Sequence, residues 1–182
     1  MPAFLQEEQE MTGANYGTIY HKVFEKMHFM EGKEEAGVEK ELLRMVASGF
    51  LTEEEKNVIH KKDFVAFANA SLGLRMEKAQ ENRRLWREQP FVIGIPAKQV
   101  KAEWDSDSLV LVQGIIDAYF EEDGEIVLVD YKTDQVKNGQ ELVDRYAEQL
   151  RYYQKALEQL TGKRVKEKIL YAVRLGEEVL VP

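Results

Sequence analysis

The chain has 182 residues, no cysteine and a net charge of −8, with 44% hydrophobic and 10% aromatic residues. This length and composition fit one globular domain with a real core. The lack of cysteine excludes disulfides, thiol catalysis, zinc ribbons and iron–sulfur clusters. No long apolar run or signal-peptide pattern is present, so we expect a cytoplasmic protein without a membrane segment. The acidic charge argues against a free-standing binder of nucleic acid.

The first half of the chain is expected to be helical. Residues 1–14 show no period and are interpreted as a linker or lead-in. Apolar residues then recur at helical spacing from Thr18, the candidate N-cap, and place His21 in the first turn. Further helices are expected at 34–47, from Thr52 (whose spacing to Glu55 fits a capping box) toward residue 59, from Asp63 as a cap to about residue 72, and at 74–86.

The basic residues of this half gather near its end. One interpretation is a solvated helix face that pairs with Glu77 and Glu81, and the other is a stripe that contacts nucleic acid. Trp86 is expected to lie in a core or an interface. The cluster consists of Arg75, Lys78, Arg83, Arg84 and Arg87.

A β-hairpin is the central element of the chain. A first strand begins near Glu88, and the loop 105–108 leads into a run of strand formers that contains Asp117. A turn signal at 122–125 separates this run from a second apolar run that ends at Asp130 and Lys132. Pairing across the turn brings Asp117 close to Asp130, and Asp130 and Lys132 point to the same face.

Two carboxylates and a lysine at one strand end suggest a metal site. Like charges at close range repel each other, and a hard divalent cation such as Mg²⁺ relieves the repulsion. A lysine beside metal-activated water suits the hydrolysis of a phosphodiester. The alternative is a surface hairpin with ordinary charges. It explains residues 121–125 but not Asp117, which lies inside an apolar run.

The C-terminal part is predicted to contain a crossover unit. A helix over about 140–160 carries an apolar stripe and ends at Gly162. Gln149 and Tyr153 share one face of it, and Arg145, one turn earlier, could reach a phosphate. Strands at 165–174 and 179–181 follow. The fold class is therefore α/β, with a mixed sheet flanked by helices, a helical part at 15–88 and a sheet core at 89–182.

Five short motifs together resemble a known family. The Asp and (Asp/Glu)-x-Lys core at Asp117, Asp130 and Lys132 is similar to that of PD-(D/E)xK nucleases, which share a restriction-endonuclease-like core. The surrounding motifs are similar to the RecB-type branch of that superfamily. From Gly17 to about Arg174, the chain most resembles the C-terminal nuclease domain of AddA subunits of bacterial AddAB (RexAB-type) helicase-nucleases. The motifs are Gly17-Thr-Ile-Tyr-His21, Arg87-Glu88-Gln-Pro-Phe91, Gly114-Ile-Ile-Asp117, Val129-Asp-Tyr-Lys-Thr133 and Gln149-Leu-Arg-Tyr-Tyr153.

The resemblance implies roles for individual residues. It implies a catalytic set of Asp117, Asp130 and Lys132. It implies a Mg²⁺ site, with Mn²⁺ as a substitute, formed by His21, Glu88, Asp117, Asp130 and the backbone carbonyl of Tyr131. It implies contacts to DNA, or support of the lysine, by Gln149, Tyr153, Arg145 and Thr133.

The resemblance also implies partners and a process. The expected substrate is single-stranded DNA, hydrolysed during double-strand-break repair and recombination, and an AddA-type domain is expected to act on the 3′-ended strand. The expected partners are a helicase portion of the same polypeptide, which makes the activity ATP-dependent, and a second protein of the AddB/RexB type. Relatives of the AddB type carry a cysteine-ligated cluster, so the absence of cysteine favours the AddA side. The acidic charge and the irregular start favour an excised domain.

Three alternatives remain open on the residues alone. The chain could be a free-standing RecB-type exonuclease, a catalytically inactive DNA-binding or scaffold domain, or a metal enzyme that acts on a small phosphoester. Metal-dependent cleavage separates a nuclease from the inactive domain, and the length of the source gene separates a free-standing exonuclease from an excised domain. A deep closed pocket would favour the third.

Overall fold

The computed structural model describes residues 16–100 and 108–182, apart from the side chains of residues 99 and 100. The predicted linker at 1–14 and most of the predicted loop at 105–108 lie outside the described residues. No helix in the described part of the chain is both long enough and apolar enough to cross a bilayer.

The described strands form one five-stranded mixed sheet in the order β1-β2-β3-β4-β5. All neighbours are antiparallel except β3 and β4, which run parallel. The predicted mixed sheet is therefore confirmed. The strands are β1 (Leu85–Pro96), β2 (Leu109–Glu122), β3 (Glu125–Lys132), β4 (Val165–Ala172) and β5 (Glu177–Leu180).

The predicted hairpin is formed by β2 and β3. Glu122 pairs with Glu125, so Asp123 and Gly124 are the only two residues of the turn. Their φ angles are 55° and 83°, and two positive φ values match the right-handed twist of the flanking strands. The hairpin is confirmed, and its register was set by this Asp-Gly pair.

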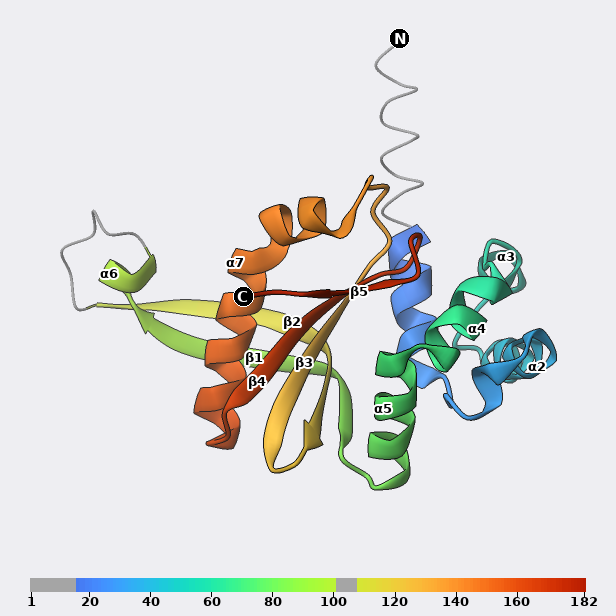
Figure 1. Cartoon of the computed structure of the whole chain (residues 1–182), viewed down its shortest axis with the longest axis horizontal. Helices are drawn as coiled ribbons and strands as arrows, with labels where there is room; N and C mark the ends of the chain where they lie inside the picture. The colour runs from blue at the N-terminus through green and yellow to red at the C-terminus, as the bar shows by residue number, and fades with distance from the viewer. Residues whose placement is uncertain (1–15, 101–107) are drawn as a thin grey trace, which may run out of the picture.

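Helix α7 (Gly139–Thr161) connects β3 to β4, and this crossover makes the two strands parallel. The Asn138 side chain accepts a hydrogen bond from the backbone N–H of Glu141 at the start of the helix. Gly162, with φ 68°, ends it. Figure 1 shows α7 lying along the sheet, on the side opposite to the N-terminal helices.

The sheet has a separate core on each face. The N-terminal helices pack with Phe120, Val129 and Tyr171 on one face, while α7 packs with Ile116 and Leu128 on the other. The arrangement is therefore helices, sheet, helix. Besides α7, the described helices are a helix at 16–26, η1 (Glu31–Lys33), α2 (Glu35–Ala47), α3 (Glu53–Asn57), α4 (Lys61–Asn69), α5 (Ser71–Glu81) and α6 (Ala97–Val100).

The helix predicted over 74–86 is wrong at its end. Helix α5 stops at Glu81, Arg83 takes a left-handed φ of 57°, and β1 begins at Leu85 rather than near Glu88. Trp86 therefore lies on a strand, where its ring stacks on that of Tyr119, its partner across the β1–β2 pair. This tertiary pairing overrides the helical propensity of a charged segment.

Two predicted N-caps are also wrong, whereas the capping box of Thr52 and Glu55 is confirmed. The first helix already includes residue 16, so Thr18 lies inside it. Helix α4 begins after His60, which frees Asp63 for another role. Asp63 Oδ2 accepts a hydrogen bond of 2.6 Å from the Tyr20 hydroxyl, and this bond connects α4 to the first helix.

The basic residues near the end of the helical half are used separately. Arg75 pairs with Glu122 and Glu167 across the sheet, rather than with Glu77 or Glu81. Arg87 is largely buried and binds backbone carbonyls, as described below. The cluster is therefore not a single stripe on one helix.

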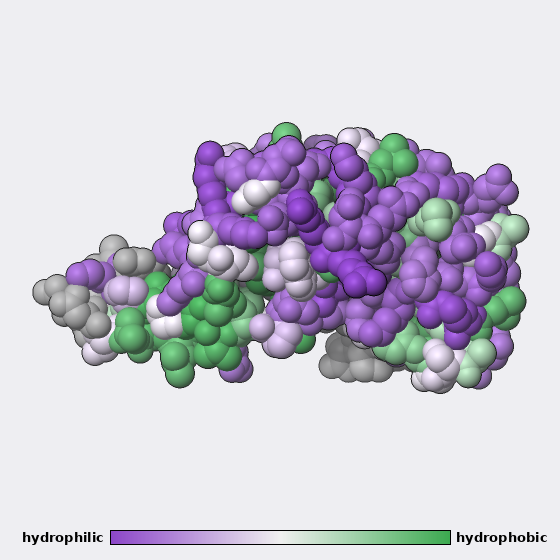
Figure 2. All heavy atoms as spheres, turned by 90° about the horizontal axis from the view of Figure 1, so that it is seen from below, coloured by the Kyte–Doolittle hydropathy of each residue, from purple (hydrophilic) through white to green (hydrophobic). Residues whose placement is uncertain are grey.

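The paired strands β1 and β2 form a two-stranded ribbon (the β1–β2 ribbon). An apolar patch covers one face of this ribbon toward the end where Pro96 pairs with Leu109. Val92, Leu109, Leu111 and Ile115 are all more than half exposed. Figure 2 shows the corresponding hydrophobic surface gathered at this end of the molecule, while most of the remaining visible surface is hydrophilic.

Candidate active site

The candidate site lies where the regular alternation of side chains between the two faces of the paired strands β1 and β2 is interrupted. Glu88 has a φ of 48°, in the left-handed region, and the pairs on either side of it place it opposite Asp117. On β2, Ala118 packs into the core of the N-terminal helices, whereas Ile116 packs into the core of α7. Residues two apart on a regular strand face the same side, so the pleat is broken at Glu88 and Asp117.

Asp117 is 8% exposed and is held by the neighbouring strand. The paired register of β2 and β3 reaches Ala118 and Val129 and goes no further. Beyond that pair, Asp117 Oδ2 accepts a hydrogen bond of 2.9 Å from the backbone N–H of Tyr131. The Asp117 carboxylate thus takes the place of a backbone hydrogen bond between β2 and β3. Its other oxygen, Oδ1, is directed to other partners.

His21 faces Asp117 from the first helix. Its Nδ1 lies 3.3 Å from Asp117 Oδ1, and its Nε2 lies 3.0 Å from the carbonyl oxygen of Tyr131. Both ring nitrogens therefore face acceptors, and the imidazolium form can donate to both. Burial by itself lowers the pKa of His21, but the Asp117 carboxylate and the Tyr131 carbonyl raise it above the ordinary value.

Glu88 completes a group of possible metal ligands. One ligand atom each of His21, Glu88 and Asp117 lies within 4.8 Å of the others. Burial, and then the charge of Asp117, raises the pKa of Glu88 to about 7. Two carboxylates and an imidazole at this range fit a divalent cation, because its charge offsets the repulsion that shifts Glu88.

Asp130 and Lys132 form a buried ion pair beside this group. Asp130 is 1% exposed, and Lys132 Nζ lies 2.8 Å from its Oδ2. That oxygen has no aligned hydrogen bond within the described residues. Burial and then the charge of Asp117 raise the pKa of Asp130. A buried carboxylate in this state can accept a further positive group.

The lysine is positioned from α7. Its Nζ donates to Gln149 Oε1 at 3.2 Å, and Gln149 Nε2 donates to the Tyr153 hydroxyl at 2.9 Å. The Tyr146 ring lies 4.0 Å from Nζ, measured to the ring centroid. Of the predicted residues, Gln149 therefore contacts the lysine directly, and Tyr153 is linked to it only through Gln149. Tyr146 belongs to the apolar stripe of α7, and it lies three residues before Gln149 on the same helix.

Arg145 and Thr133 lie at the margin of the site. Arg145 Nη1 is 3.3 Å from Asp134 Oδ1, so its guanidinium is already paired with a carboxylate. Thr133 lies close to the first helix, because a Cβ added to Gly17 would be 3.1 Å from Thr133 Oγ1. Glycine at 17 thus lets the helix that carries His21 approach the end of β3.

Two arginines fix the end of the helix that carries His21. Arg87 Nη1 donates to the carbonyl oxygens of Glu25 and Met27, both at 2.8 Å, and its guanidinium lies over the Phe29 ring. Arg44 Nη2 donates to the carbonyl of Lys26 at 2.9 Å. These bonds satisfy carbonyls that a helix end leaves without partners.

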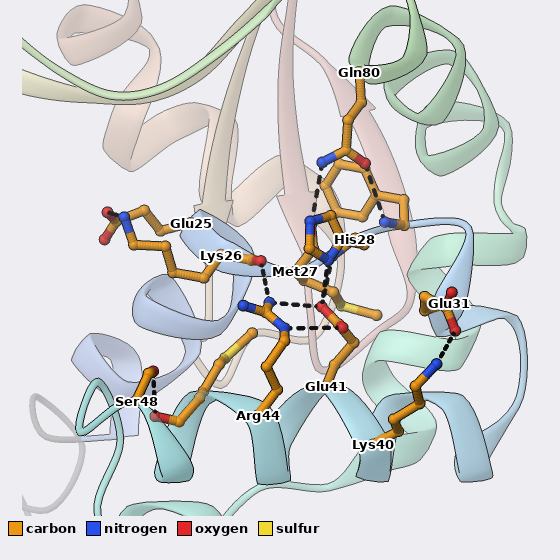
Figure 3. A network of polar contacts seen from close by, with 12 residues as sticks. Glu25, Lys26, Met27, His28, Glu31, Lys40, Glu41, Arg44, Ser48 and Gln80 are labelled. Atoms are coloured by element: carbon orange, nitrogen blue, oxygen red, sulfur yellow. Dashed lines mark hydrogen bonds and ion pairs between the residues drawn. The ribbon is translucent and has the colours of Figure 1, made fainter.

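Glu41 organises this support (Figure 3). It is buried, and it accepts hydrogen bonds from the backbone N–H of His28 and from Arg44. Burial alone would raise its pKa, but Arg44 and the His28 N–H bring it below the ordinary value. His28 belongs to this network and His60 to the start of α4, and neither lies in the metal-ligand group.

Most of the predicted site residues thus lie in two neighbouring groups, and Arg145 and Thr133 lie at their margin. His21, Glu88 and Asp117 form one group, and Asp130, Lys132 and Gln149 form the other. The Tyr131 carbonyl lies against His21. The part played by Arg87 was missed, and the only signal in the sequence was its place directly before Glu88.

Comparison with known proteins defines the class. A family model described as the PD-(D/E)XK nuclease superfamily matches residues 2–179, and the chain belongs to this family. The class of enzyme is a nuclease, in agreement with the mixed sheet and the acid-x-Lys hairpin.

Curated relatives narrow the comparison further. The whole chain is 37% identical to part of an ATP-dependent helicase/nuclease subunit from Lachnoclostridium phytofermentans. It is 36% identical, over 93% of its length, to the protein of the same name from Clostridium botulinum strain Loch Maree. Both relatives are of the AddA type. The chain spans 16% of the first relative and 13% of the second.

Proposed function

We propose that the chain is a metal-dependent deoxyribonuclease domain that hydrolyses phosphodiester bonds of single-stranded DNA. The observation that carries the proposal is the clustering of His21, Glu88 and Asp117 beside the Asp130–Lys132 pair. Burial and the charge of Asp117 raise the pKa values of Glu88 and Asp130, and such carboxylates beside a lysine are costly unless they bind a cation and a phosphate.

The proposed metal is Mg²⁺, with Mn²⁺ as a substitute. His21, Glu88 and Asp117 would hold it, joined by Asp130 and by the Tyr131 carbonyl once His21 no longer donates to that oxygen. A divalent cation at this place supplies positive charge against the negative charge that develops on the phosphate. Oxygen-rich ligands with one imidazole suit these ions.

Lys132 is the proposed catalytic partner of Asp117 and Asp130. An ammonium group has three donors, and among the described residues two of them face Asp130 and Gln149. The third can donate to a phosphate oxygen or orient the attacking water. The Asp130 carboxylate, 2.8 Å from Nζ, holds the lysine in place.

Gln149, Tyr153, Arg145 and Thr133 are the proposed contacts to DNA. Burial raises the pKa of Tyr153 to about 12, so its phenol stays neutral and can donate a hydrogen bond. Arg145 would exchange its contact with Asp134 for a phosphate. We also propose that residues 15–182 form one nuclease domain after a lead-in at 1–14.

The names of the relatives support a wider proposal. The domain would work joined to a helicase that uses ATP to deliver the strand, and its partner would be a protein of the AddB/RexB type. The process would be double-strand-break repair and recombination in the cytoplasm, where the bacterial chromosome lies. The net charge of −8 fits a domain that relies on other parts of a complex for DNA affinity.

The test is cleavage of end-labelled single-stranded DNA in Mg²⁺ or Mn²⁺ by the wild type, Asp117→Ala and Lys132→Ala. We expect cleavage by the wild type and a loss of about 100-fold or more in both variants. Arg164→Ala is the control, because this arginine is exposed and lies just before the start of β4. Lys132 pairs with Ala172 at the other end of β4. Equal cleavage by all four proteins would refute the assignment of the site.

A further inference from the structure

A groove lies between α7 and the β1–β2 ribbon, next to Lys132. Its volume is about 370 Å³, and the residues of interest on its wall are Phe91, Gly114, Gln149, Tyr152 and Tyr153. Gln149 connects it to the site, because the same side chain accepts the hydrogen bond from Lys132. The groove is therefore next to the place where Lys132 would bind a phosphate, and the nucleotide attached to that phosphate would lie in the groove.

The groove has a fixed aromatic wall. Phe91 and Tyr153 meet edge to face, with ring centroids 5.5 Å apart, and the Tyr153 hydroxyl is held by Gln149. Glycine at 114 is needed there, because an added Cβ would lie 2.9 Å from Phe91 Cε1 and 3.6 Å from Tyr153 Cε1. Tyr152 is half-buried and supplies another aromatic ring to the same groove.

We propose that this groove binds one unpaired nucleobase of the strand, stacked on Tyr152, directly beside the phosphodiester that is cut. The inference rests on the proposed function and adds to it the site that distinguishes single-stranded from duplex DNA. A groove of this volume falls in the range of small-ligand sites and holds a base with its sugar. A base in a duplex is stacked on both faces and paired at its edge, so it cannot enter.

The chemistry of the wall agrees with a base that is bound without regard to its identity. Aromatic side chains stack on the π-face that every base has, and such stacking is sequence-tolerant. Arg145 and Glu148 also line the groove, and each is paired with an opposite charge, to Asp134 and to Arg151 respectively. The groove thus offers stacking next to a site that binds the phosphate.

Binding can be tested apart from cleavage. The probe is a short single-stranded oligonucleotide with one 2-aminopurine, placed at each position in turn, with Ca²⁺ as the metal. We expect the wild type to quench the fluorescence at one position and Tyr152→Ala to lose this quenching. Affinity should fall about tenfold in Tyr152→Ala, which corresponds to about 1.4 kcal/mol of stacking, and Tyr152→Phe should restore it.

An abasic nucleotide identifies the partner of Tyr152. At the quenched position it should weaken binding to the wild type about tenfold and cause no further loss in Tyr152→Ala, because both changes remove the same contact. Tyr119→Ala, which removes a half-buried tyrosine outside the groove, should retain the full abasic penalty. Independent, additive losses from Tyr152→Ala and the abasic nucleotide would overturn the proposal, as would unchanged affinity in Tyr152→Ala or no binding by the wild type.

Cleavage measured on the same strands separates this inference from the proposed function. Stacking at one position without cleavage in Mg²⁺ supports the base site and contradicts the proposed catalysis. Cleavage that is equally fast with the wild type and Tyr152→Ala on intact and abasic strands contradicts the base site and leaves the catalysis standing.

Discussion

Glu88 combines a strained backbone with a displaced pKa. A left-handed φ costs an ordinary residue about 1 kcal/mol or more, and here it turns the carboxylate toward Asp117 and His21. Strain of this kind persists where the surrounding structure enforces it, and it gathers at functional sites. Here the neighbours of Glu88, Arg87 and Gln89, are both paired with residues of β2, and this pairing holds the strained residue in place.

Replacing Glu88 with glycine should therefore separate stability from metal binding. We expect Glu88→Gly to raise the free energy of unfolding by about 0.5–1 kcal/mol, because glycine adopts positive φ readily, and to weaken Mg²⁺ binding strongly. Urea unfolding and calorimetric titration with Mg²⁺ would measure the two effects. Arg83→Gly is the matched control, since Arg83 has a φ of 57° and an exposed side chain. It should gain similar stability and bind metal as the wild type does.

At the scale of elements, Arg75 joins α5 to two strands. Its guanidinium donates two hydrogen bonds to Glu122 of β2 and two to Glu167 of β4, at 2.7–3.0 Å. The hydrogen bonds from Arg75 are the main cause that lowers the pKa of Glu122 to about 2. The folded pKa lies below the unfolded value of about 4.5, so this contact stabilises the fold above about pH 4.5. The contribution disappears as the pH falls toward 2.

Glu122→Gln should accordingly lower the free energy of unfolding by about 1–2 kcal/mol at pH 7, a value discounted for partial exposure. The difference from the wild type should shrink between about pH 4.5 and pH 2. Thermal unfolding across this range would measure it. Glu177→Gln, at an exposed position on β5, should differ from the wild type by less than about 0.5 kcal/mol. A difference for Glu122→Gln that stays constant with pH would show that the ion pair is not its cause.

Elements were predictable where a local pattern carried the information. The stripe of α7, together with Gly162, predicted a helix within about one residue of the observed Gly139–Thr161. The Asp123–Gly124 turn fixed the hairpin. The end of α5 was missed because residues 82–86 contain neither glycine nor proline, and what ends the helix is the pairing of Trp86 with Tyr119.

At the scale of the whole molecule, a bound cation should act as a stabiliser. Metal that binds only the folded chain adds about 2.7 kcal/mol at a concentration of 100 times Kd, or a rise in Tm of roughly 5–10 °C at this chain length. We expect this shift with Mg²⁺ or Mn²⁺ and its reversal by chelator. In Asp117→Asn, whose amide oxygen can still accept the Tyr131 N–H, the shift should vanish while the fold is kept. An equal shift in this variant would place the cation elsewhere.

The sequence by itself determined the parts that are local. Charge and apolar periodicity, turn residues and five short motifs were sufficient for the mixed sheet, the hairpin, the crossover helix and the nuclease family. They also selected the residues that meet at the site, because Asp117 interrupts an apolar run and the acid-x-Lys pair ends a strand. The hairpin turn, the apolar stripe and each single motif are made by residues close together in the chain.

Only the tertiary structure decided how those residues divide. The break in the pleat where Glu88 lies opposite Asp117, the hydrogen bond from Lys132 to Gln149, and the contacts of Arg87 with Glu25 and Met27 join segments far apart in the chain. The groove beside Lys132 likewise exists only because α7 packs against β1 and β2. Such contacts follow from packing and from the need to satisfy buried polar groups, and no local pattern encodes them.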